Sequence, residues 1–214
     1  MASRTESQVV AQKTEDTPIL KQRGLMIHRD MPAVLQAEQD SSTQVVVMPA
    51  EETPRLNIRW MIRRDMLEVL RTEQDSFDKS VWTEEDFLRC LRHRNCICIV
   101  VEQGERVVGF MIYELHAKKL NILNIAVSPG ARRAGIGAAM VATKLVSKLK
   151  QPQPTKDRIT VVVRKTNTTA QLFFQKQGFT VMSTLPKFFE DNDEDGLLME
   201  YKLEAEVEAP KTGS

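Results

Sequence analysis

A chain of 214 residues, 42% of them hydrophobic, has the length of one domain of ordinary size and enough apolar side chains for a single core. Its net charge of +1 excludes a general attraction to nucleic acid or to a membrane surface, so we expect neither as a partner. The polar first residues carry no signal-peptide pattern and no run of about 18 apolar residues occurs, which predicts a cytoplasmic protein with reduced cysteines.

The N-terminal part contains a duplication. Residues 26–41 (MIHRDMPAVLQAEQDS) nearly repeat residues 61–76 (MIRRDMLEVLRTEQDS), and only the second copy continues into a strongly patterned sequence. Two copies are too few for a stacked repeat array, which needs about three units to bury a core. We therefore predict a mobile extension over residues 1–56, one domain over residues 57–203 and a mobile tail over residues 204–214. A regulatory or dimerising role for the first copy is the alternative.

The predicted domain alternates strands and helices with clear boundaries. Thr83, followed by three acidic residues, marks a helix start, and Gly178 marks a left-handed helix end. The order predicts a mixed α/β fold with a sheet of about seven strands flanked by about four helices. Runs rich in β-formers predict strands at 56–62, 96–102, 106–115, 120–127, 158–164, 179–185 and 196–203. Apolar residues at helical spacing predict helices at 64–77, 82–94, about 136–149 and 168–177.

The stretch ARRAGIGAAM, residues 131–140, joins the strand at 120–127 to the following helix. Its glycines, Gly135 and Gly137, allow the N–H groups of a first helical turn to approach a pyrophosphate closely. A dinucleotide fingerprint requires a third glycine where Met140 stands, and the Gly-Lys-Ser/Thr of a Walker loop is absent. The loop therefore predicts a phosphate site of another class.

Four further motifs surround this loop in a fixed order. They are Trp82-Thr83-Glu84, the strand Asn124 to Val127, Asn167 ahead of Gly178-Phe179, and Glu194-Asp195 before the last strand. Together with the loop they resemble the GNAT acyltransferase superfamily, and within it the ribosomal-protein alanine N-acetyltransferases of the RimI type. The resemblance covers roughly residues 57–203. It implies the GNAT fold and acetyl-CoA as the acyl-donor cosubstrate.

The resemblance also implies where the cosubstrate binds. The backbone of Ile125 and Val127 would pair with the pantetheine arm and leave the thioester beside Ala126. Asn167 and the helix that contains Phe174 would lie along the far side of the cofactor. The residues expected around the pyrophosphate are Arg132, Arg133, Ala134, Gly135, Ile136, Gly137 and Ala138.

The positions that carry acid–base chemistry in the resembled families hold other residues here. The Glu and Tyr of the RimI type correspond to Val162 and Phe174, and the Glu of the histone-type enzymes corresponds to Asn121. The paired substrate-binding tyrosines correspond to Phe188 and Phe189. This departure affects the expectation of catalysis much more than the expectation of cofactor binding.

Glu114 and His116, at the end of the strand 106–115, offer a substitute base that could act through a water. A solvated strand end is the alternative. Phe77 and Trp82 could line a peptide groove or belong to the core. The acidic run EDNDED could attract the positive N-terminus of a peptide or simply be solvated.

A metal site is not expected. Cys90 and His93 fall on a predicted helix, whereas Cys96 and Cys98 alternate with isoleucines on a predicted strand. Buried reduced thiols are the simpler interpretation of this cysteine pattern.

The basicity of the acceptor points to the substrate class. An α-amine with a pKa of about 7.7–8 is about one-tenth neutral at pH 7, whereas a lysine amine near 10.4 is neutral in about one molecule in 2,500. A site without a base therefore favours an N-terminal amine, and positioning lowers part of the barrier. We predict an acetyl-CoA-dependent N-acetyltransferase that modifies the N-terminus of a protein, such as a ribosomal protein, by direct amine attack on the thioester. The alternative is a catalytically weak or inactive acyl-CoA-binding module of the same fold. No sequence signal specifies an oligomeric state.

Overall fold

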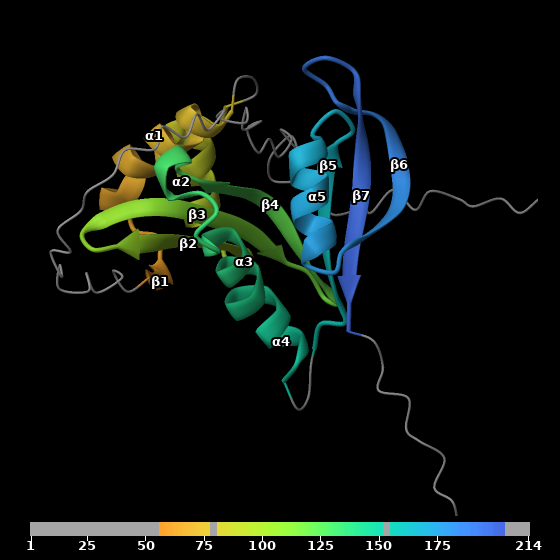
Figure 1. The fold of residues 1–214 in the computed structure, drawn as a ribbon, viewed down its shortest axis with the longest axis horizontal. Coiled ribbons are helices and arrows are strands. Elements are labelled where there is room, and N and C mark those ends of the chain that lie inside the picture. Colours follow the sequence, from red (N-terminus) through yellow and green to blue (C-terminus); the bar gives the residue numbers. More distant parts are fainter. Residues whose placement is uncertain (1–55, 78–80, 152–154, 204–214) are drawn as a thin grey trace, which may run out of the picture.

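The computed structural model of the protein describes residues 56–77, 81–151 and 155–203 (Figure 1). These residues form a seven-stranded sheet in the order β1-β2-β3-β4-β5-β7-β6 with helices packed on it, which confirms the predicted mixed α/β fold. The strands are β1 Leu56–Trp60, β2 Cys96–Gln103, β3 Arg106–Leu115, β4 Lys119–Val127, β5 Arg158–Arg164, β6 Thr180–Phe189 and β7 Glu194–Lys202. The helices are α1 Met66–Ser76, α2 Glu84–Arg92, α3 Ile136–Val141, α4 Ser147–Leu149 and α5 Thr168–Lys176. The first copy of the duplication and the C-terminal tail lie outside the described residues.

One parallel strand pair interrupts the otherwise antiparallel sheet. β4 and β5 pair only as far as Ile122 and Val161, after which the two strands diverge (Figure 1). Leu123 is an extra residue on β4 where the β3–β4 register shifts. Such a bulge bends the strand that carries it. The second half of β4 therefore has no strand partner on the β5 side within the described sheet.

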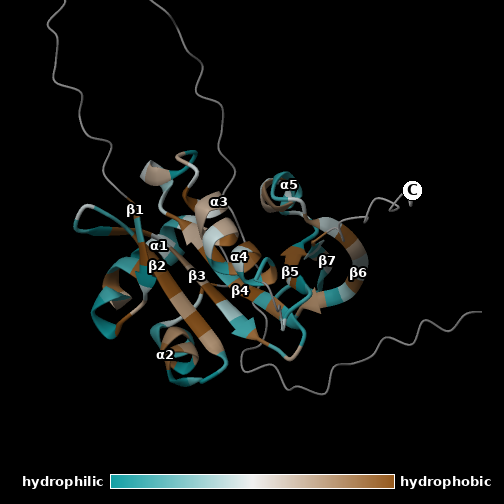
Figure 2. Ribbon diagram, turned by 90° about the horizontal axis from the view of Figure 1, so that it is seen from below, coloured by the Kyte–Doolittle hydropathy of each residue, from teal (hydrophilic) through white to brown (hydrophobic). Residues whose placement is uncertain are grey.

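Two apolar layers cover the sheet because successive side chains on a strand point to opposite faces. On one side α3, α4 and α5 pack over residues such as Met111 and Ile125. On the other side α1 and α2 pack over residues such as Phe110 and Ile112. Figure 2 shows the apolar strands β2 to β4 between α2 on one side and α3 with α4 on the other. We call these sides the α3 face and the α1 face.

Local signals set several helix ends as predicted. The Asp86 carboxylate accepts a hydrogen bond from the Thr83 N–H at 2.9 Å, and the Thr83 hydroxyl accepts one from the Asp86 N–H at 3.4 Å. Gly178 follows α5 with a φ of 87°. The helix after the glycine loop is less regular than predicted, because Ala142–Val146 form a π turn between α3 and α4. The Thr143 hydroxyl of this segment donates to the Ala139 carbonyl of α3.

Cys90, Cys96 and Cys98 are buried free thiols, as predicted. Burial raises the pKa of Cys98 to about 12, so this thiol stays protonated at neutral pH. Within residues 56–77, 81–151 and 155–203, no three His, Cys, Asp or Glu side chains are grouped so that they could hold a metal ion. None of the helices that the structure describes is long and apolar enough to cross a membrane.

Candidate functional site

The free edge of β4 is the first feature of the site. The Ser128 N–H donates to the Val108 carbonyl at 2.9 Å, so the end of β4 is bonded to β3. Backbone groups of successive residues in a strand point to opposite sides, and the N–H groups of Ile125 and Val127 therefore point away from β3, toward the side where β5 has diverged. An extended ligand can pair with them as an added strand would. Ala126, between them, is buried in the apolar layer of the α1 face.

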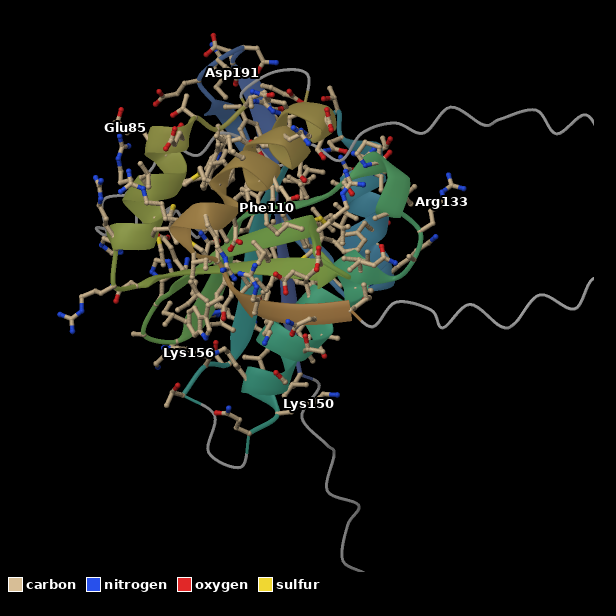
Figure 3. All side chains as sticks on the ribbon, turned by 90° about the vertical axis from the view of Figure 1, so that its left-hand side faces the viewer. Glu85, Phe110, Arg133, Lys150, Lys156 and Asp191 are labelled. Atoms are coloured by element: carbon tan, nitrogen blue, oxygen red, sulfur yellow. The ribbon has the colours of Figure 1, made fainter. Side chains whose placement is uncertain are left out.

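Arg132 fixes the loop that follows β4. Its Nε donates to the Val127 carbonyl at 3.0 Å, and its Nη2 donates to the Ser76 hydroxyl at 3.2 Å. These bonds tie the loop to the ends of β4 and α1. Arg133 has a φ of 64°, and its exposed side chain points away from the body of the protein (Figure 3). One arginine of the loop is thus an anchor, and the other lies at the surface.

The two glycines of the loop are needed for different reasons. Gly135 precedes α3 with a φ of 76°, a left-handed conformation that other residues rarely adopt. Gly137 lies against α5, because a Cβ there would come within 3.1 Å of the Phe173 ring. The first N–H groups of a helix lack partners within the helix and carry its positive dipole end, so this turn can hold an anion. The other residues of the turn are Ala134, Ile136 and Ala138, of which Ile136 is buried.

The predicted far side of the cofactor is built from α5. The Asn167 Oδ1 accepts a hydrogen bond from the Ala170 N–H at 3.0 Å, so this side chain caps the helix. Phe174 is fully buried, and its ring centroid lies 5.0 Å from those of Phe173 and Phe179. The structure therefore places Phe174 in the core of the α3 face. A tyrosine hydroxyl at this position would need a buried hydrogen-bond partner.

Val162, at the predicted base position, lies on the α1 face of β5 and packs against β7. A Cβ on Gly196 would lie 2.6 Å from Val162 Cγ1 and 3.1 Å from Phe188 Cβ, so both side chains cover this glycine. On β4, Asn121 Oδ1 accepts a hydrogen bond from the Thr160 hydroxyl at 2.9 Å. An apolar contact and a neutral amide thus occupy two positions at which the resembled enzymes carry a carboxylate.

The structure brings Glu114 and His116 together. The Glu114 Oε2 lies 3.3 Å from the His116 Nε2, and Glu114 stands opposite Asn121 in the β3–β4 register. A carboxylate next to an imidazole can accept and pass on a proton. Asn121 precedes Asn124 by three residues of strand, which span about 10 Å. The pair therefore needs more than one intervening water to reach the free part of β4.

The four aromatic residues expected at the substrate differ in burial. Phe77 and Trp82 are 4% and 3% exposed, which places them in the core of the α1 face. Phe189 is also buried, with the Arg164 guanidinium 4.2 Å above its ring centroid. Phe188 is half-buried and is the one of the four with appreciable exposed surface.

The acidic run at residues 190–195 is bonded to the end of β5. Arg164, whose side chain is completely buried, lies 2.7 Å from Asp191 Oδ1 and 3.0 Å from Glu194 Oε2. Burial raises the pKa of Glu194, but hydrogen bonds from Thr166 and Arg164 outweigh this effect and hold that pKa below its usual value. The run forms a turn whose charges are partly neutralised from within the protein, which leaves less negative charge for a peptide N-terminus.

Glu73 on α1 is a buried carboxyl group that no motif singles out. Its Oε1 accepts a hydrogen bond from the Trp82 N–H at 2.8 Å, and its Oε2 accepts one from Asn124 Nδ2 at 3.0 Å. Glu73 thus joins α1, the segment before α2, and β4 at its bulge. Burial raises the pKa of Glu73 to about 8. The available sequence signal was an acidic residue four positions after Val69, on the apolar side of a helix.

Glu73 makes the stability of the protein depend on pH. Its pKa rises from 4.5 to about 8 on folding. The folded state therefore binds more protons than the unfolded state between these values, and its stability falls as the pH rises through them. We expect the free energy of unfolding to fall by a few kcal/mol between about pH 5 and pH 8, because one pKa unit corresponds to about 1.4 kcal/mol. Glu73→Gln should remove this slope in urea unfolding measured across that range, and equal slopes for the two proteins would contradict the expectation.

Comparison with known proteins places the chain in a family. The Acetyltransferase (GNAT) family matches residues 61–179. A stretch of 105 residues, 49% of this chain, is 30% identical to an uncharacterised N-acetyltransferase of Methanocaldococcus jannaschii. The match spans 65% of the length of that curated relative.

Solved structures share the fold. The ribosomal-protein-S18-alanine N-acetyltransferase of Escherichia coli has a TM-score of 0.61 at 20% identity, over 75% of this chain and 99% of its own. Ard1 of Thermoplasma volcanium has a TM-score of 0.60 at 25% identity, over 70% and 99%. NAA60 of Arabidopsis thaliana, solved with acetyl-CoA, has a TM-score of 0.60 at 17% identity, over 70% and 100%. Because the family match covers more than half of the chain and the sheet has the same fold, this protein belongs to the GNAT acetyltransferase family.

Proposed function

We propose that the protein is an acetyl-CoA-dependent N-acetyltransferase that acts on the N-terminal amine of a protein or peptide. The observation that carries the proposal is the continuity between the free edge of β4 and the turn at Gly135. Ile125 and Val127 would hold the pantetheine arm, and the loop from Arg132 to Ala138 would hold the pyrophosphate. The acetyl-CoA complex of Arabidopsis NAA60, a protein of the same fold, supports this choice of ligand.

The acceptor would approach from the α1 face, because the turn expected to hold the pyrophosphate begins α3 on the other face. On the α1 face the residues nearest to the divergence of β4 and β5 include Asn124 and Val162. The name of the E. coli relative specifies an alanine of a ribosomal protein as acceptor. That name, together with the higher neutral fraction of an α-amine, supports a protein N-terminus over a lysine side chain.

The reaction is a direct transfer of the acetyl group. The lone pair of the neutral amine forms the C–N bond at the thioester carbonyl carbon, and the C–S bond breaks. The proton leaves the nitrogen to water, with Glu114 and His116 as the proposed final acceptors. A thiolate with a pKa near 8.5 is a good leaving group and needs little help from an acid. Orientation on the strand therefore supplies much of the rate increase.

Two measurements test the proposal. Calorimetry should detect acetyl-CoA binding, and a thiol reagent should then report CoA release with a set of peptides that differ in the N-terminal residue. The three cysteines are buried, so the protein itself should contribute little to the thiol signal. Lack of acetyl-CoA binding would exclude the proposal. Binding without CoA release for any peptide would favour the second candidate, a non-catalytic acyl-CoA-binding module, which the apolar residues Val162 and Phe174 support.

Restoring a base at Val162 should increase turnover. Val162 is half-buried on the α1 face, so a glutamate there can reach the acceptor side, and a positioned base contributes about a hundredfold or more. We expect Val162→Glu to raise the rate of CoA release at least about tenfold, because Phe188 and Gly196 restrict its position. The matched control is Val162→Gln, which has the same size without basicity. Equal rates for the two variants would contradict a decayed base site.

Phe174, at the position of the acid in the resembled family, should respond differently from Val162. Phe174→Tyr would place a hydroxyl in the core of the α3 face, at a cost of about 1–3 kcal/mol if it finds no partner. We therefore expect this substitution to lower the free energy of unfolding and to leave CoA release no faster. Urea unfolding and the same thiol assay measure both effects. Faster release without loss of stability would show that Phe174 faces the cosubstrate.

A further inference from the structure

Asn124 has one half of its amide group bonded and the other half without a partner. The side chain is 3% exposed, and its Nδ2 donates to Glu73 Oε2 at 3.0 Å. Its Oδ1 is buried and accepts no hydrogen bond from any residue that the structure describes. A buried carbonyl without a donor is unfavourable, and such groups in a native structure require a specific explanation.

The position of Asn124 suggests what the donor is. Asn124 lies on β4 two residues beyond Ile122, where pairing with β5 ends, and directly before Ile125, whose N–H points toward the divergence. Its side chain is on the α1 face, because it is bonded to Glu73 of α1. The turn that is expected to hold the pyrophosphate begins α3, on the other face of the sheet, so we place the acceptor on the α1 face.

Glu73 determines which atom of the amide is left for a ligand. Above its pKa of about 8, Glu73 is a carboxylate whose oxygens only accept hydrogen bonds, so Asn124 must turn its Nδ2 toward Glu73 and its Oδ1 away. The Trp82 N–H holds the other carboxylate oxygen of Glu73 at 2.8 Å, which restricts rotation of the carboxylate. The pair therefore presents an acceptor atom in a defined place.

We propose that Asn124 Oδ1 accepts a hydrogen bond from the acceptor amine, and that Glu73 is a positioning residue that keeps this oxygen turned toward the amine. The inference rests on the proposed function, because it requires an amine beside the free edge of β4. Holding one N–H of the neutral amine leaves its lone pair to be directed at the carbonyl carbon. No bond is made or broken by Asn124 or Glu73, and the proton lost on transfer still goes to water.

Glu73→Gln should exchange the positions of Nδ2 and Oδ1 in the Asn124 side chain, while both side chains keep their size. The new glutamine gives its carbonyl to the Trp82 N–H and its NH₂ group to Asn124, which must then offer Oδ1 to it and turn Nδ2 toward the acceptor. Adding Asn124→Asp restores an outward oxygen, because one carboxylate oxygen accepts from the glutamine and the other faces the amine. The double variant is therefore a rescue that a merely structural role would not give.

The experiment measures kcat and KM at pH 9, where Glu73 is a carboxylate and the peptide amine is neutral. The probe is the best acceptor from twenty decapeptides that differ in the N-terminal residue. We expect Glu73→Gln to raise KM for the peptide about tenfold, the loss of one hydrogen bond, with unchanged acetyl-CoA affinity by calorimetry. The double variant should recover most of the loss. Thr72→Val, a buried polar substitution on the same helix, is the control and should match the wild type.

The outcomes separate this inference from the proposed function. If the wild type transfers acetyl to none of the twenty peptides, the proposed function fails and this inference fails with it. If the wild type is active but Glu73→Gln keeps its peptide KM, the inference alone is overturned. It is also overturned if the double variant fails to recover, or if acetyl-CoA affinity falls as much as peptide affinity, since Asn124 would then serve the cosubstrate.

Discussion

Arg164→Met should lower the free energy of unfolding by about 3 kcal/mol at neutral pH. The Arg164 side chain is completely buried and bonded to Asp191 and Glu194, so its removal leaves two carboxylates without their cation. The Asp191 side chain is 34% exposed and can be solvated again. We therefore expect a loss at the low end of the range that is usual for breaking a buried ion pair. The loss of the cation above the Phe189 ring adds to the effect.

The neighbouring ion pair provides the control for this prediction. Lys165 and Asp195 lie 3.2 Å apart with side chains 58% and 32% exposed. Exposed pairs contribute at most about 1 kcal/mol, so Lys165→Met should change stability little. Urea unfolding of both variants measures the difference. If the two substitutions cost the same, Arg164 does not hold the β6–β7 turn in the way described.

Gly135→Val should weaken acetyl-CoA binding at least about tenfold. The φ of 76° at Gly135 costs an L-residue about 1–2 kcal/mol, and a β-branched side chain more. A Cβ at this position meets no atom within 4 Å, so the expected effect comes from the backbone and not from a clash. The turn must either keep the strain or move, and movement would misdirect the N–H groups that are expected to face the pyrophosphate.

Gly130, in the same loop, is the matched control. It has no positive φ, and a Cβ there also meets nothing within 4 Å, so Gly130→Ala should bind acetyl-CoA like the wild type. Calorimetry on both variants gives the two affinities, and circular dichroism checks that both remain folded. Unchanged affinity in Gly135→Val would mean that the cosubstrate does not use this turn.

The order of strands and helices could be predicted from the sequence because each element carries a local pattern. The hairpin turn at Gly104 lies between the strands predicted at 96–102 and 106–115. Like the cap at Thr83 and the helix end at Gly178, it depends on neighbouring residues only. The bulge at Leu123 is a feature of the pairing of β4 with β3, and the π turn at Ala142–Val146 departs from the helical spacing that the residues themselves follow. No periodic pattern of residues in the sequence predicts the bulge or the π turn.

In the candidate site, too, features set by neighbouring residues could be predicted, and contacts between separate elements could not. The glycine loop is contiguous, and its turn could be predicted from six residues. The contact of Gly137 with Phe173 could not be predicted, because it joins α3 to α5. The Glu73–Asn124 bond likewise joins residues from α1 and β4, and it depends on burial that a single sequence does not reveal. From the sequence, the acidic run could be a peptide-binding patch or a solvated loop; its Asp191 and Glu194 are paired with Arg164, a residue far from them in the chain.

The proposed activity is the transfer of acetyl from acetyl-CoA to an N-terminal amine. The most direct test uses one peptide that carries both a free N-terminus and an internal lysine, incubated with acetyl-CoA and the protein. Fragmentation by mass spectrometry then locates the acetyl group. We expect it on the α-amine alone, because the site offers no strong base for a lysine. Acetyl on the lysine, or none above the rate without protein, would contradict the proposed activity.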